Sequence, residues 1–348
     1  MSTAPTHQHA FFDDYSEGAH PDILRRLSET NLNQEIGYGE DRLSARAADL
    51  LRNAMAQPNA DIHFVTGGTQ ANLIALAAIL KPYESVIAAA SGHIAVHEAG
   101  AIEATGHRIN QVESEDGKVT PQRVQAVVDA HTDEHMVKPR AVYISNVTEL
   151  GTVYRAAELD ALSAVCKANG LLLYLDGARL GSALTSPVGD LDLPGIARRV
   201  DLFYIGGTKN GALLGEALVI ANPRLREGFR YHVKQRGALL AKGRVVGAQF
   251  ATLFEDDLFF RLARHANTQA QRLAEGIQAR GFGLLAQPQS NLIFPIFPDA
   301  VIAGLRRRFA FHTWARVGTD RSAVRLATSW ATPAGRVDDF LNHLETLL

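Results

Sequence analysis

Cysteine and long apolar runs are both scarce in this sequence. Cys166 is the one cysteine among 348 residues, so no disulfide can form within the chain, and a reducing compartment is expected. The longest apolar run, 72–80, is too short to cross a membrane, and the first residues lack the basic and apolar segments of a secretion signal. These absences predict a cytoplasmic protein with no membrane partner.

An excess of charge of either sign is also missing. Lysine and arginine number 35 and aspartate and glutamate 37, which gives a net charge of −2 at pH 7. Such a balance provides no basic surface for a polyanion, so nucleic acid is not expected as a partner. A chain of 348 residues is longer than one typical domain, so two domains are expected.

The middle of the chain alternates between apolar strand-like runs and helix-like segments. This alternation predicts an α/β domain with a mostly parallel sheet, whose ligand site lies at the carboxyl ends of the strands. Cys166 falls in the last helix-like segment, where a buried structural thiol is expected. The strand-like runs cover 62–65, 85–89, 141–146, 171–178 and 201–209, and the helix-like segments cover 70–80, 94–106 and 156–170.

The two ends of the chain differ from this pattern. Residues 1–45 are interrupted by glycine and proline and are expected to form an arm, which precedes a large domain over 46–245. Residues 246–348 start with a long helix-like segment up to residue 281, continue with short strand-like runs, and close with an amphipathic helix. This order predicts a smaller α+β C-terminal domain.

Lys209 ends the last strand-like run and is flanked by glycines. A lysine at a strand end, in a run otherwise free of charge, is expected to be desolvated. Desolvation lowers the pKa of the amine and favours the neutral form, which condenses with an aldehyde. A solvated loop lysine is the alternative, and this residue alone does not distinguish the two.

Asp176 ends another buried run, in the sequence Leu-Asp-Gly-Ala-Arg. A carboxylate at such a position suits pyridoxal-phosphate (PLP) catalysis, in which an acid keeps the pyridine nitrogen protonated so that the ring accepts electrons. The alternative is an Asx turn in which Asp176 pairs locally with Arg179.

A Gly-Gly-Thr turn stands between the run 62–65 and a helix-like segment. Free N–H groups and the helix dipole make such a turn an anion site, and Thr69 adds a hydroxyl. The turn is neither a Walker A loop nor a GxGxxG motif. An anion site, an acid and a lysine on successive strand ends together indicate a PLP enzyme.

Histidine and arginine supply the other candidates. His93 follows a strand-like run, where its imidazole would lie flat on the pyridine ring, and Glu98 would face the same pocket; capping or packing is the alternative for either residue. Arg325 lies in an alternating strand-like stretch and would bind an amino-acid carboxylate through its planar fork. Spacing alone does not favour Arg325 over Arg316 or Arg321.

These segments together resemble the threonine aldolase and β-eliminating lyase family of PLP-dependent enzymes, fold type I, the aspartate-aminotransferase-like fold. The resemblance runs over nearly the whole chain. It implies retro-aldol cleavage of L-threonine, L-allo-threonine or a related L-β-hydroxy-α-amino acid to glycine and an aldehyde. It also implies a homotetramer, a dimer of dimers with its active sites at the dimer interface. The matching segments are FFDDYSEGAHP, GYGED, FVTGGTQAN, GHIAVHEAG, TELGTVY, YLDGARLG, YIGGTKNGALLGEA and VRLATSW.

The resemblance further implies roles for single residues. Lys209 matches the lysine that holds PLP as a Schiff base, and Asp176 matches the acid on the pyridine nitrogen. Arg179 matches the arginine beside the ring and the substrate, and His93 matches the histidine that stacks on the ring and handles the substrate hydroxyl.

The remaining roles concern the phosphate, the substrate carboxylate and the subunit interface. Gly68 and Thr69 match the phosphate-binding turn, and Arg325 matches the arginine that holds the substrate carboxylate. The candidates to reach across the dimer interface are Tyr38 toward the substrate, and Arg236 and Lys242 toward the cofactor.

Two stretches depart from the family pattern, and both concern the substrate. Typical threonine aldolases carry a second active-site histidine in a Thr-His-Asn stretch, where this chain has Glu149. They begin with Arg-Ser-Asp-Thr, whose serine helps to bind the carboxylate; here Asp13 and Ser16 lie in the matching stretch and become the candidates. The cofactor residues are unaffected.

The base that removes the β-hydroxyl proton is expected to be His93, directly or through a water, with Glu149 as the second candidate. β-Elimination from an amino acid with a β-leaving group is the alternative reaction, because it uses the same carbanion chemistry. A PLP-binding protein without catalysis is a further alternative. His93, His97 and Glu98 do not form an HExxH motif, so no metal is expected.

Overall fold

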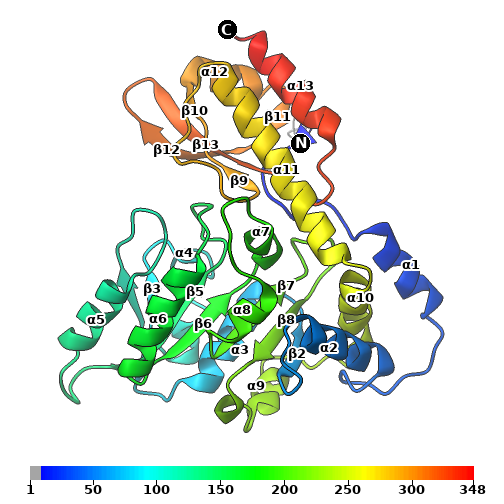
Figure 1. The fold of residues 1–348 in the computed structure, drawn as a ribbon, viewed down its shortest axis with the longest axis vertical. Helices are drawn as coiled ribbons and strands as arrows, with labels where there is room; N and C mark the ends of the chain where they lie inside the picture. Colours follow the sequence, from blue (N-terminus) through cyan, green and yellow to red (C-terminus); the bar gives the residue numbers. More distant parts are fainter. Residues whose placement is uncertain (1–8) are drawn as a thin grey trace, which may run out of the picture.

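The computed structural model describes residues 9–348, so the first eight residues of the expected arm lie outside it. A large lower part is built around a central sheet, and a smaller upper part contains the C-terminal strands and helices (Figure 1). The long helix α11 (Leu258–Ala279) runs between the two parts.

The central sheet has seven strands, and only β8 runs against the others. β8 is antiparallel to both of its neighbours, β2 and β7, and every other pair is parallel. The carboxyl ends of six strands and the amino end of β8 therefore meet at one edge. This is the mostly parallel α/β sheet that the sequence predicts. The strands in order are β2 (Asp61–Val65), β8 (Glu216–Ile220), β7 (Leu202–Gly206), β6 (Leu172–Asp176), β5 (Lys138–Ser145), β3 (Glu84–Ala89) and β4 (Ile109–Val112).

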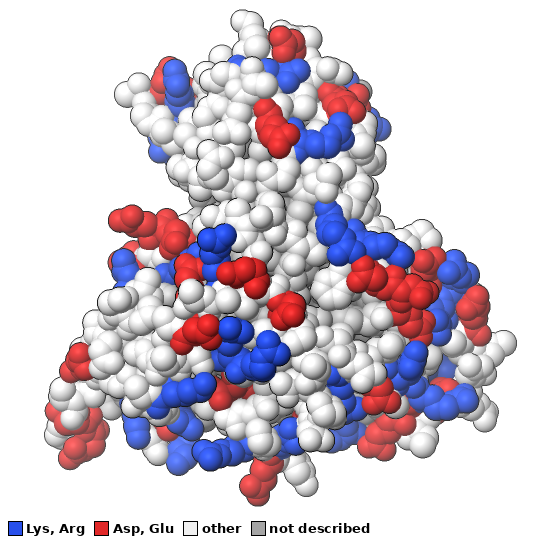
Figure 2. Space-filling model, viewed as in Figure 1, with Lys and Arg blue, Asp and Glu red and all other residues white. Residues whose placement is uncertain are grey.

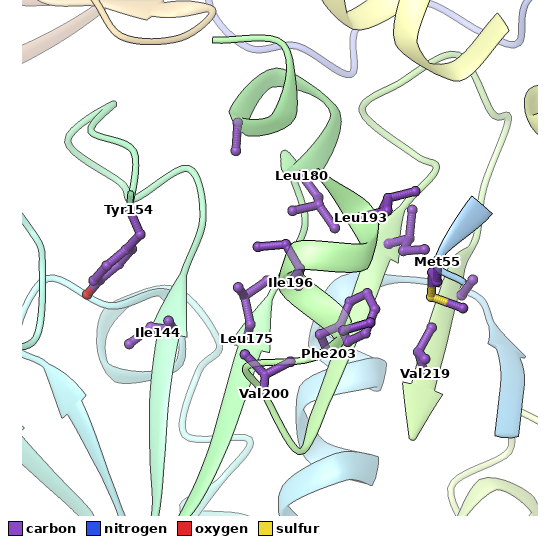
Figure 3. Packing of buried hydrophobic residues seen from close by; sticks show 14 of the residues in the cluster. Met55, Ile144, Tyr154, Leu175, Leu180, Leu193, Ile196, Val200, Phe203 and Val219 are labelled. Carbon is purple, nitrogen blue, oxygen red and sulfur yellow. The ribbon is translucent and has the colours of Figure 1, made fainter. Parts of the chain in front are cut away.

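Helices cover both faces of this sheet, as the continuous apolar strands require. Successive residues of β6 belong to two different hydrophobic clusters: Leu173 and Leu175 pack on one side, Leu172 and Tyr174 on the other. Figure 3 shows the first side, where Leu175 and Phe203 of the sheet lie near residues of α8. The helices of the large part are α2 (Arg42–Ala54), α3 (Gly68–Ile79), α4 (His93–Val96), α5 (Pro121–Ala130), α6 (Ala156–Ala168), α7 (Leu180–Leu184), α8 (Leu193–Ala197), α9 (Phe229–Gln235) and α10 (Arg244–Phe254), with 3-10 turns at Glu103–Thr105 and Pro223–Leu225.

The smaller part has its own core and also holds the start of the chain. β1 (His9–Ala10) pairs in parallel with β11 (Phe309–Ala310), and the buried Phe11 ring contacts Phe309 and Phe340. α1 (Pro21–Glu29) then returns to the large part, where it packs on α10. The other elements of the smaller part are β9 (Leu292–Ile293), β10 (Ile296–Pro298), α12 (Asp299–Leu305), β12 (His312–Val317), β13 (Arg321–Ala327) and α13 (Ala334–Glu345).

Two predicted helices are interrupted in the structure. The segment up to residue 281 forms α10 and α11, separated by Asp256 and Asp257 with φ of 52° and 60°. Aspartate tolerates this left-handed conformation because its short side chain bonds locally. The predicted helix 94–106 is broken into the turn α4 and the 3-10 turn Glu103–Thr105, since Ala99 and Gly100 between them also have positive φ.

The surface charges and the burial of the one cysteine agree with what the composition predicts. Figure 2 shows acidic and basic side chains interspersed over the face in view. Within residues 9–348, no helix is long and apolar enough to span a membrane. Cys166 is buried, and burial together with the charge of Asp201 raises the pKa of its thiol to about 12. It is a structural thiol, as expected.

Candidate active site

A cavity of about 300 Å³ lies at the edge where the strand ends meet. Its walls come from the turns that follow β2, β3, β5, β6 and β7, and from the start of β8. It thus draws on segments far apart in the sequence, as expected for an open α/β sheet. Of the predicted site residues, the cavity walls contain Gly68, Thr69, His93, Glu149, Asp176, Arg179 and Lys209.

The turn after β2 offers an anion site. α3 begins at Gly68, and its N-cap Gly67 has no side chain to cap the helix, so the first N–H groups remain available at the cavity. A Cβ added to Gly68 would lie 2.9 Å from the Tyr204 hydroxyl, so glycine is needed there for close approach. Gln70 secures the turn by accepting hydrogen bonds from the Thr66 N–H at 3.0 Å and its hydroxyl at 2.7 Å.

Lys209 lines the same cavity as this turn. Burial, reinforced by the charge of Arg179, lowers the pKa of its amine, while Asp14, Asp176 and Glu216 oppose this effect. Its Nζ lies 5.7 Å from the centre of the Tyr15 ring. The neutral amine that the sequence predicts is therefore favoured by the surroundings.

Asp176 is held by four hydrogen bonds from different parts of the fold. Its Oδ2 accepts from the Tyr143 hydroxyl at 2.6 Å and from Asn72 Nδ2 at 3.0 Å. Its Oδ1 accepts from the Tyr204 hydroxyl at 2.5 Å and from the Ala178 N–H at 3.0 Å. These contacts fix the carboxylate at the floor of the cavity.

His93 is oriented by a buried carboxylate. Its Nδ1 lies 2.7 Å from Glu98 Oε1, and because a carboxylate accepts hydrogen bonds, Nδ1 is the donor and Nε2 is left for another partner. Asn72 Nδ2 donates to the same Glu98 oxygen at 2.7 Å and also to Asp176. A continuous hydrogen-bonded path therefore joins the imidazole to the floor of the cavity.

Arg179 pairs with Asp14, and the local pair with Asp176 that the sequence allowed is not formed. Arg179 donates through Nε at 2.6 Å and Nη2 at 3.0 Å, which is the bidentate geometry of a strong pair, and Asn291 Nδ2 donates to the same carboxylate at 2.8 Å. Burial alone would raise the pKa of Asp14, but the charges of Arg179 and Lys209 and the hydrogen bonds lower it to about 2.

Glu149 lines the cavity, where it accepts a hydrogen bond from Ser145 Oγ at 3.1 Å. Burial and the neighbouring charge of Asp176 raise the pKa of this carboxyl. The turn around it is closed instead by Thr148 and Thr152, whose hydroxyls are 2.7 Å apart and whose backbones bond to each other. A hydrogen bond from its own backbone N–H opposes this rise in pKa, and the residue lines the cavity.

Arg325 lies just outside the cavity walls. Its Nη2 donates to the Phe12 carbonyl at 3.1 Å, its guanidinium lies 5.8 Å from the Trp314 ring centre, and its Nε has no partner among the described residues. The charges of Arg179 and Asp14 affect it, which places it near the cavity mouth. The two arginines that spacing did not exclude are engaged with acids on the surface: Arg316 with Asp299 at 2.7 Å and Arg321 with Asp320 at 4.0 Å.

The structure does not bring five other candidates into the cavity of the same chain. Asp13 and Ser16 are hydrogen-bonded to each other at 2.8 Å, while the adjacent Asp14 and Tyr15 make the cavity contacts. The other three do not line this cavity. Tyr38 lines a second, open cavity of about 570 Å³, the Arg236 carbonyl accepts a hydrogen bond from Gln70 Nε2, and Lys242 is exposed.

Glu216 and Thr208 also line the cavity but escaped the sequence analysis. Glu216 is the first residue of β8, and burial raises its pKa to about 7, although hydrogen bonds from Thr208 and the Gly207 N–H partly offset this effect. The available signal was an acid inside the apolar stretch 212–221. Nothing in that stretch reveals that the strand runs antiparallel and delivers its start to the site.

The residues present fit PLP. The first turn of α3 suits a phosphate, Lys209 supplies an amine with a lowered pKa, and Asp176 supplies a buried carboxylate. His93 adds an imidazole on the cavity wall. Within residues 9–348, no group of three or more histidine, cysteine or acidic side chains is arranged to hold a metal ion.

Comparison with known sequences points in the same direction. The profile of the family described as β-eliminating lyase matches residues 13–299. The low specificity L-threonine aldolase of Pseudomonas aeruginosa is 35% identical over 350 aligned residues, covering 98% of this chain and 99% of that protein. A second low specificity L-threonine aldolase, from a Pseudomonas species, is also 35% identical, over 97% of this chain and 96% of its own.

Solved structures give the same picture. The threonine aldolase of Leishmania major superposes with a TM-score of 0.96 at 47% identity, covering 97% of this chain and 99% of that one. An aspartate aminotransferase of Thermus thermophilus superposes with a TM-score of 0.71 at 16% identity, over 98% of this chain and 92% of its own, which supports the fold alone. The fold type expected from the sequence is confirmed.

The raised pKa of Glu216 predicts a loss of stability with rising pH. Its pKa is about 7 in the folded chain against an ordinary value of 4.5, so between these values the unfolded chain releases a proton that the folded chain keeps. Between pH 4.5 and pH 7.5, the free energy of unfolding of the cofactor-free enzyme should therefore fall by on the order of 3 kcal/mol relative to that of Glu216→Gln. Urea unfolding of both proteins measures this difference, and parallel pH dependences would contradict it.

Proposed function

Because the chain belongs to the β-eliminating lyase family, we propose that it is a PLP-dependent aldehyde-lyase of the L-threonine aldolase type. Its substrates are L-threonine, L-allo-threonine or related L-β-hydroxy-α-amino acids, and its products are glycine and an aldehyde. The observation that carries the proposal is the single cavity that joins Lys209, Asp176, His93 and the anion site of α3, in a chain with threonine aldolase relatives over nearly its full length.

Four features of the chain would hold the cofactor. The first turn of α3 would bind the phosphate, Lys209 would bind the aldehyde, Asp176 would pair with the pyridine nitrogen and His93 would stack on the ring. All of these residues line the cavity. When bound, PLP supplies an electron sink for the pair released as the Cα–Cβ bond of the substrate breaks. The network around Asp176 keeps its carboxylate in place for this purpose.

Two side chains on the cavity wall are placed to take the proton of the substrate hydroxyl. Glu98 fixes the His93 ring with Nε2 available, as a general base requires. The raised pKa of Glu149 brings a weak base closer to working pH. We propose that Glu149 either takes the proton itself or orients His93 to do so.

Arginines at the cavity mouth would bind the substrate carboxylate. Arg179 commits Nε and Nη2 to Asp14, so its charge is largely neutralised. Arg325 has one hydrogen bond to a backbone carbonyl and a buried Nε without a partner in the described chain. We infer that Arg325 provides the bidentate contact and that Arg179 supports it.

We also propose that the chain forms a homotetramer, a dimer of dimers in which Tyr38, Arg236 and Lys242 act in the site of a partner subunit. Exposed apolar side chains that line the second cavity support an interface, among them Ile36 at 68% and Tyr231 at 82% exposure. The Arg236 Nε is buried and lacks a partner among the described residues. A cytoplasmic location stays a prediction from the sequence.

Product analysis with Lys209→Ala tests the proposed activity. The wild-type enzyme should release glycine and acetaldehyde from L-threonine, and borohydride should fix reduced PLP on Lys209. The variant should lose both, because the cofactor needs this amine, whereas Lys167→Ala on the surface should keep both. Pyruvate and ammonia from L-cysteine, without glycine from L-threonine, would instead show β-elimination. A label on another lysine would contradict the role of Lys209.

Glu149→Gln should lower the maximal cleavage rate and leave cofactor binding intact. The wild-type rate should rise with pH as Glu149 ionises, and the variant should lack this rise because an amide does not ionise. Pre-steady-state cleavage of L-phenylserine measures the step directly. Ser145→Ala, which removes the hydrogen bond but keeps the carboxyl, is the matched control. Equal rates in Glu149→Gln and wild type would leave this residue a purely structural role.

Arg325→Lys should weaken amino-acid binding far more than PLP binding. Lysine keeps the charge but loses the planar fork, at a cost of about 1–3 kcal/mol for a charged hydrogen bond. The Michaelis constant for L-threonine should rise accordingly, whereas Arg321→Lys on the surface should leave it unchanged. An unaltered constant in Arg325→Lys would assign the carboxylate to Arg179.

A further inference from the structure

Glu216 is a buried carboxyl on the cavity wall that the proposed reaction does not use. Since β8 runs antiparallel between β2 and β7, its first residue reaches the edge where those strands end. In the sheet register Glu216 lies opposite Val65 of β2 and Gly206 of β7. Its side chain therefore stands between the anion-binding turn that follows β2 and the Lys209 loop that follows β7.

The hydrogen bonds of Glu216 involve the residue before Lys209. The Gly207 N–H donates to Oε2 at 2.9 Å, and the Thr208 hydroxyl donates to Oε1 at 2.7 Å. The same Thr208 oxygen accepts from the Gly215 N–H at 3.1 Å. While Glu216 is ionised, the hydroxyl hydrogen of Thr208 thus points to Glu216 and not into the cavity that both residues line.

An ionised Glu216 would weaken the binding of a phosphate in this cavity. The dianion would be repelled by the carboxylate, and the Thr208 hydrogen would remain engaged. A neutral carboxyl removes the repulsion. It also donates its own proton to the Thr208 oxygen, so that the threonine hydroxyl can turn its hydrogen toward the anion.

We propose that Glu216 takes up a proton when the cofactor phosphate binds, and that Glu216 and Thr208 act together as a proton-dependent positioning pair for that phosphate. One proton passes from solvent to Glu216 as the phosphate enters and returns to solvent as it leaves. No bond to the phosphate is made or broken. This inference depends on the proposed function in one respect, namely that the phosphate belongs to PLP.

The surroundings of Glu216 make this proton exchange accessible near neutral pH. Burial raises the pKa of the carboxyl to about 7, so both forms are populated there and an incoming negative charge favours the neutral one. The lowering influences are the two hydrogen bonds and the charge of Lys209, and the charge of Asp176 acts in the same direction as burial. The titratable groups that face Glu216 are Lys209 from the β7 loop, Asp176 from β6, and the phenols of Tyr174 and Tyr204.

The test compares ligands that differ only in the phosphate and cannot condense with Lys209. Pyridoxamine 5′-phosphate and pyridoxamine are titrated into the cofactor-free enzyme from pH 6.5 to 9, and the ratio of their dissociation constants isolates the phosphate. Above pH 7 the advantage of the phosphate should fall by up to about tenfold per pH unit in the wild type. Calorimetry in buffers of different ionisation enthalpy should count about one proton taken up per site at pH 8.

Four variants identify the group responsible. Glu216→Gln should remove the pH dependence and the proton uptake, and it should bind the phosphate ligand more tightly than the wild type at pH 8.5. Thr208→Val should weaken phosphate binding at every pH, whereas Thr208→Ser should behave as the wild type. Glu84→Gln, a buried carboxyl at the opposite edge of the sheet, should keep the wild-type slope.

A wild-type ratio that does not change with pH would overturn the inference, as would a Glu216→Gln enzyme that keeps the slope. If that variant does not fold, the proton count on the wild type decides, and a value near zero rejects the idea. Failure of the proposed function looks different. In that case PLP would label another lysine or amino acids would not be cleaved, while phosphate-linked proton uptake would still be measurable.

Discussion

The buried carboxylate of Asp176 is the constraint on which the site depends. A carboxylate that is 3% exposed is very costly unless its oxygens are hydrogen-bonded. Its hydrogen-bond donors come from α3, β5, β7 and the turn after β6. All four segments must therefore be in their final positions before both carboxylate oxygens are fully hydrogen-bonded. Burial, followed by the charge of Asp176, raises the pKa of Tyr143 and Tyr204 well above the usual value, which keeps both phenols as donors.

The other charges in the cavity are balanced in a similar way. Arg179 would leave a strong positive field beside Lys209, but the bidentate pair with Asp14 compensates most of it. What remains is enough, together with burial, to lower the pKa of the lysine. Glu149 and Glu216 stand at two other points of the wall, and burial raises the pKa of each carboxyl. The cavity thus holds several groups whose pKa values are shifted from their ordinary values, which suits chemistry that moves protons.

The sequence was sufficient to predict that the lysine, the acid and the glycine turn line one cavity, because the signal for each is local. Lys209, Asp176 and the turn at Gly68 each follow a continuous apolar run, and parallel strands necessarily bring such ends together. β8 escaped detection because glycines and Glu216 interrupt its apolar pattern.

Other contacts could not be predicted from the sequence, because they join residues that are far apart in the chain or belong to different subunits. The pair of Asp14 with Arg179 spans 165 positions, so the sequence indicated Asp13 and Ser16 but not Asp14, which makes the contact. Roles that belong to a partner subunit, as expected for Tyr38, depend on a surface that one chain does not contain. Local spacing carries no information about either kind of contact.

The path of the first residues has a consequence for synthesis on the ribosome. His9 pairs with Phe309, and Phe11 packs on Phe340, while Asp14 lies three residues further on at the cavity. The partners that anchor this segment are made long after it, tens of seconds later at roughly 5–20 residues per second. The sheet can assemble on the nascent chain, but the Asp14 segment is anchored beside Arg179 only after Phe309 and Phe340 have been made. Until then, a ribosome-bound intermediate would hold the Arg179 guanidinium without the Asp14 carboxylate.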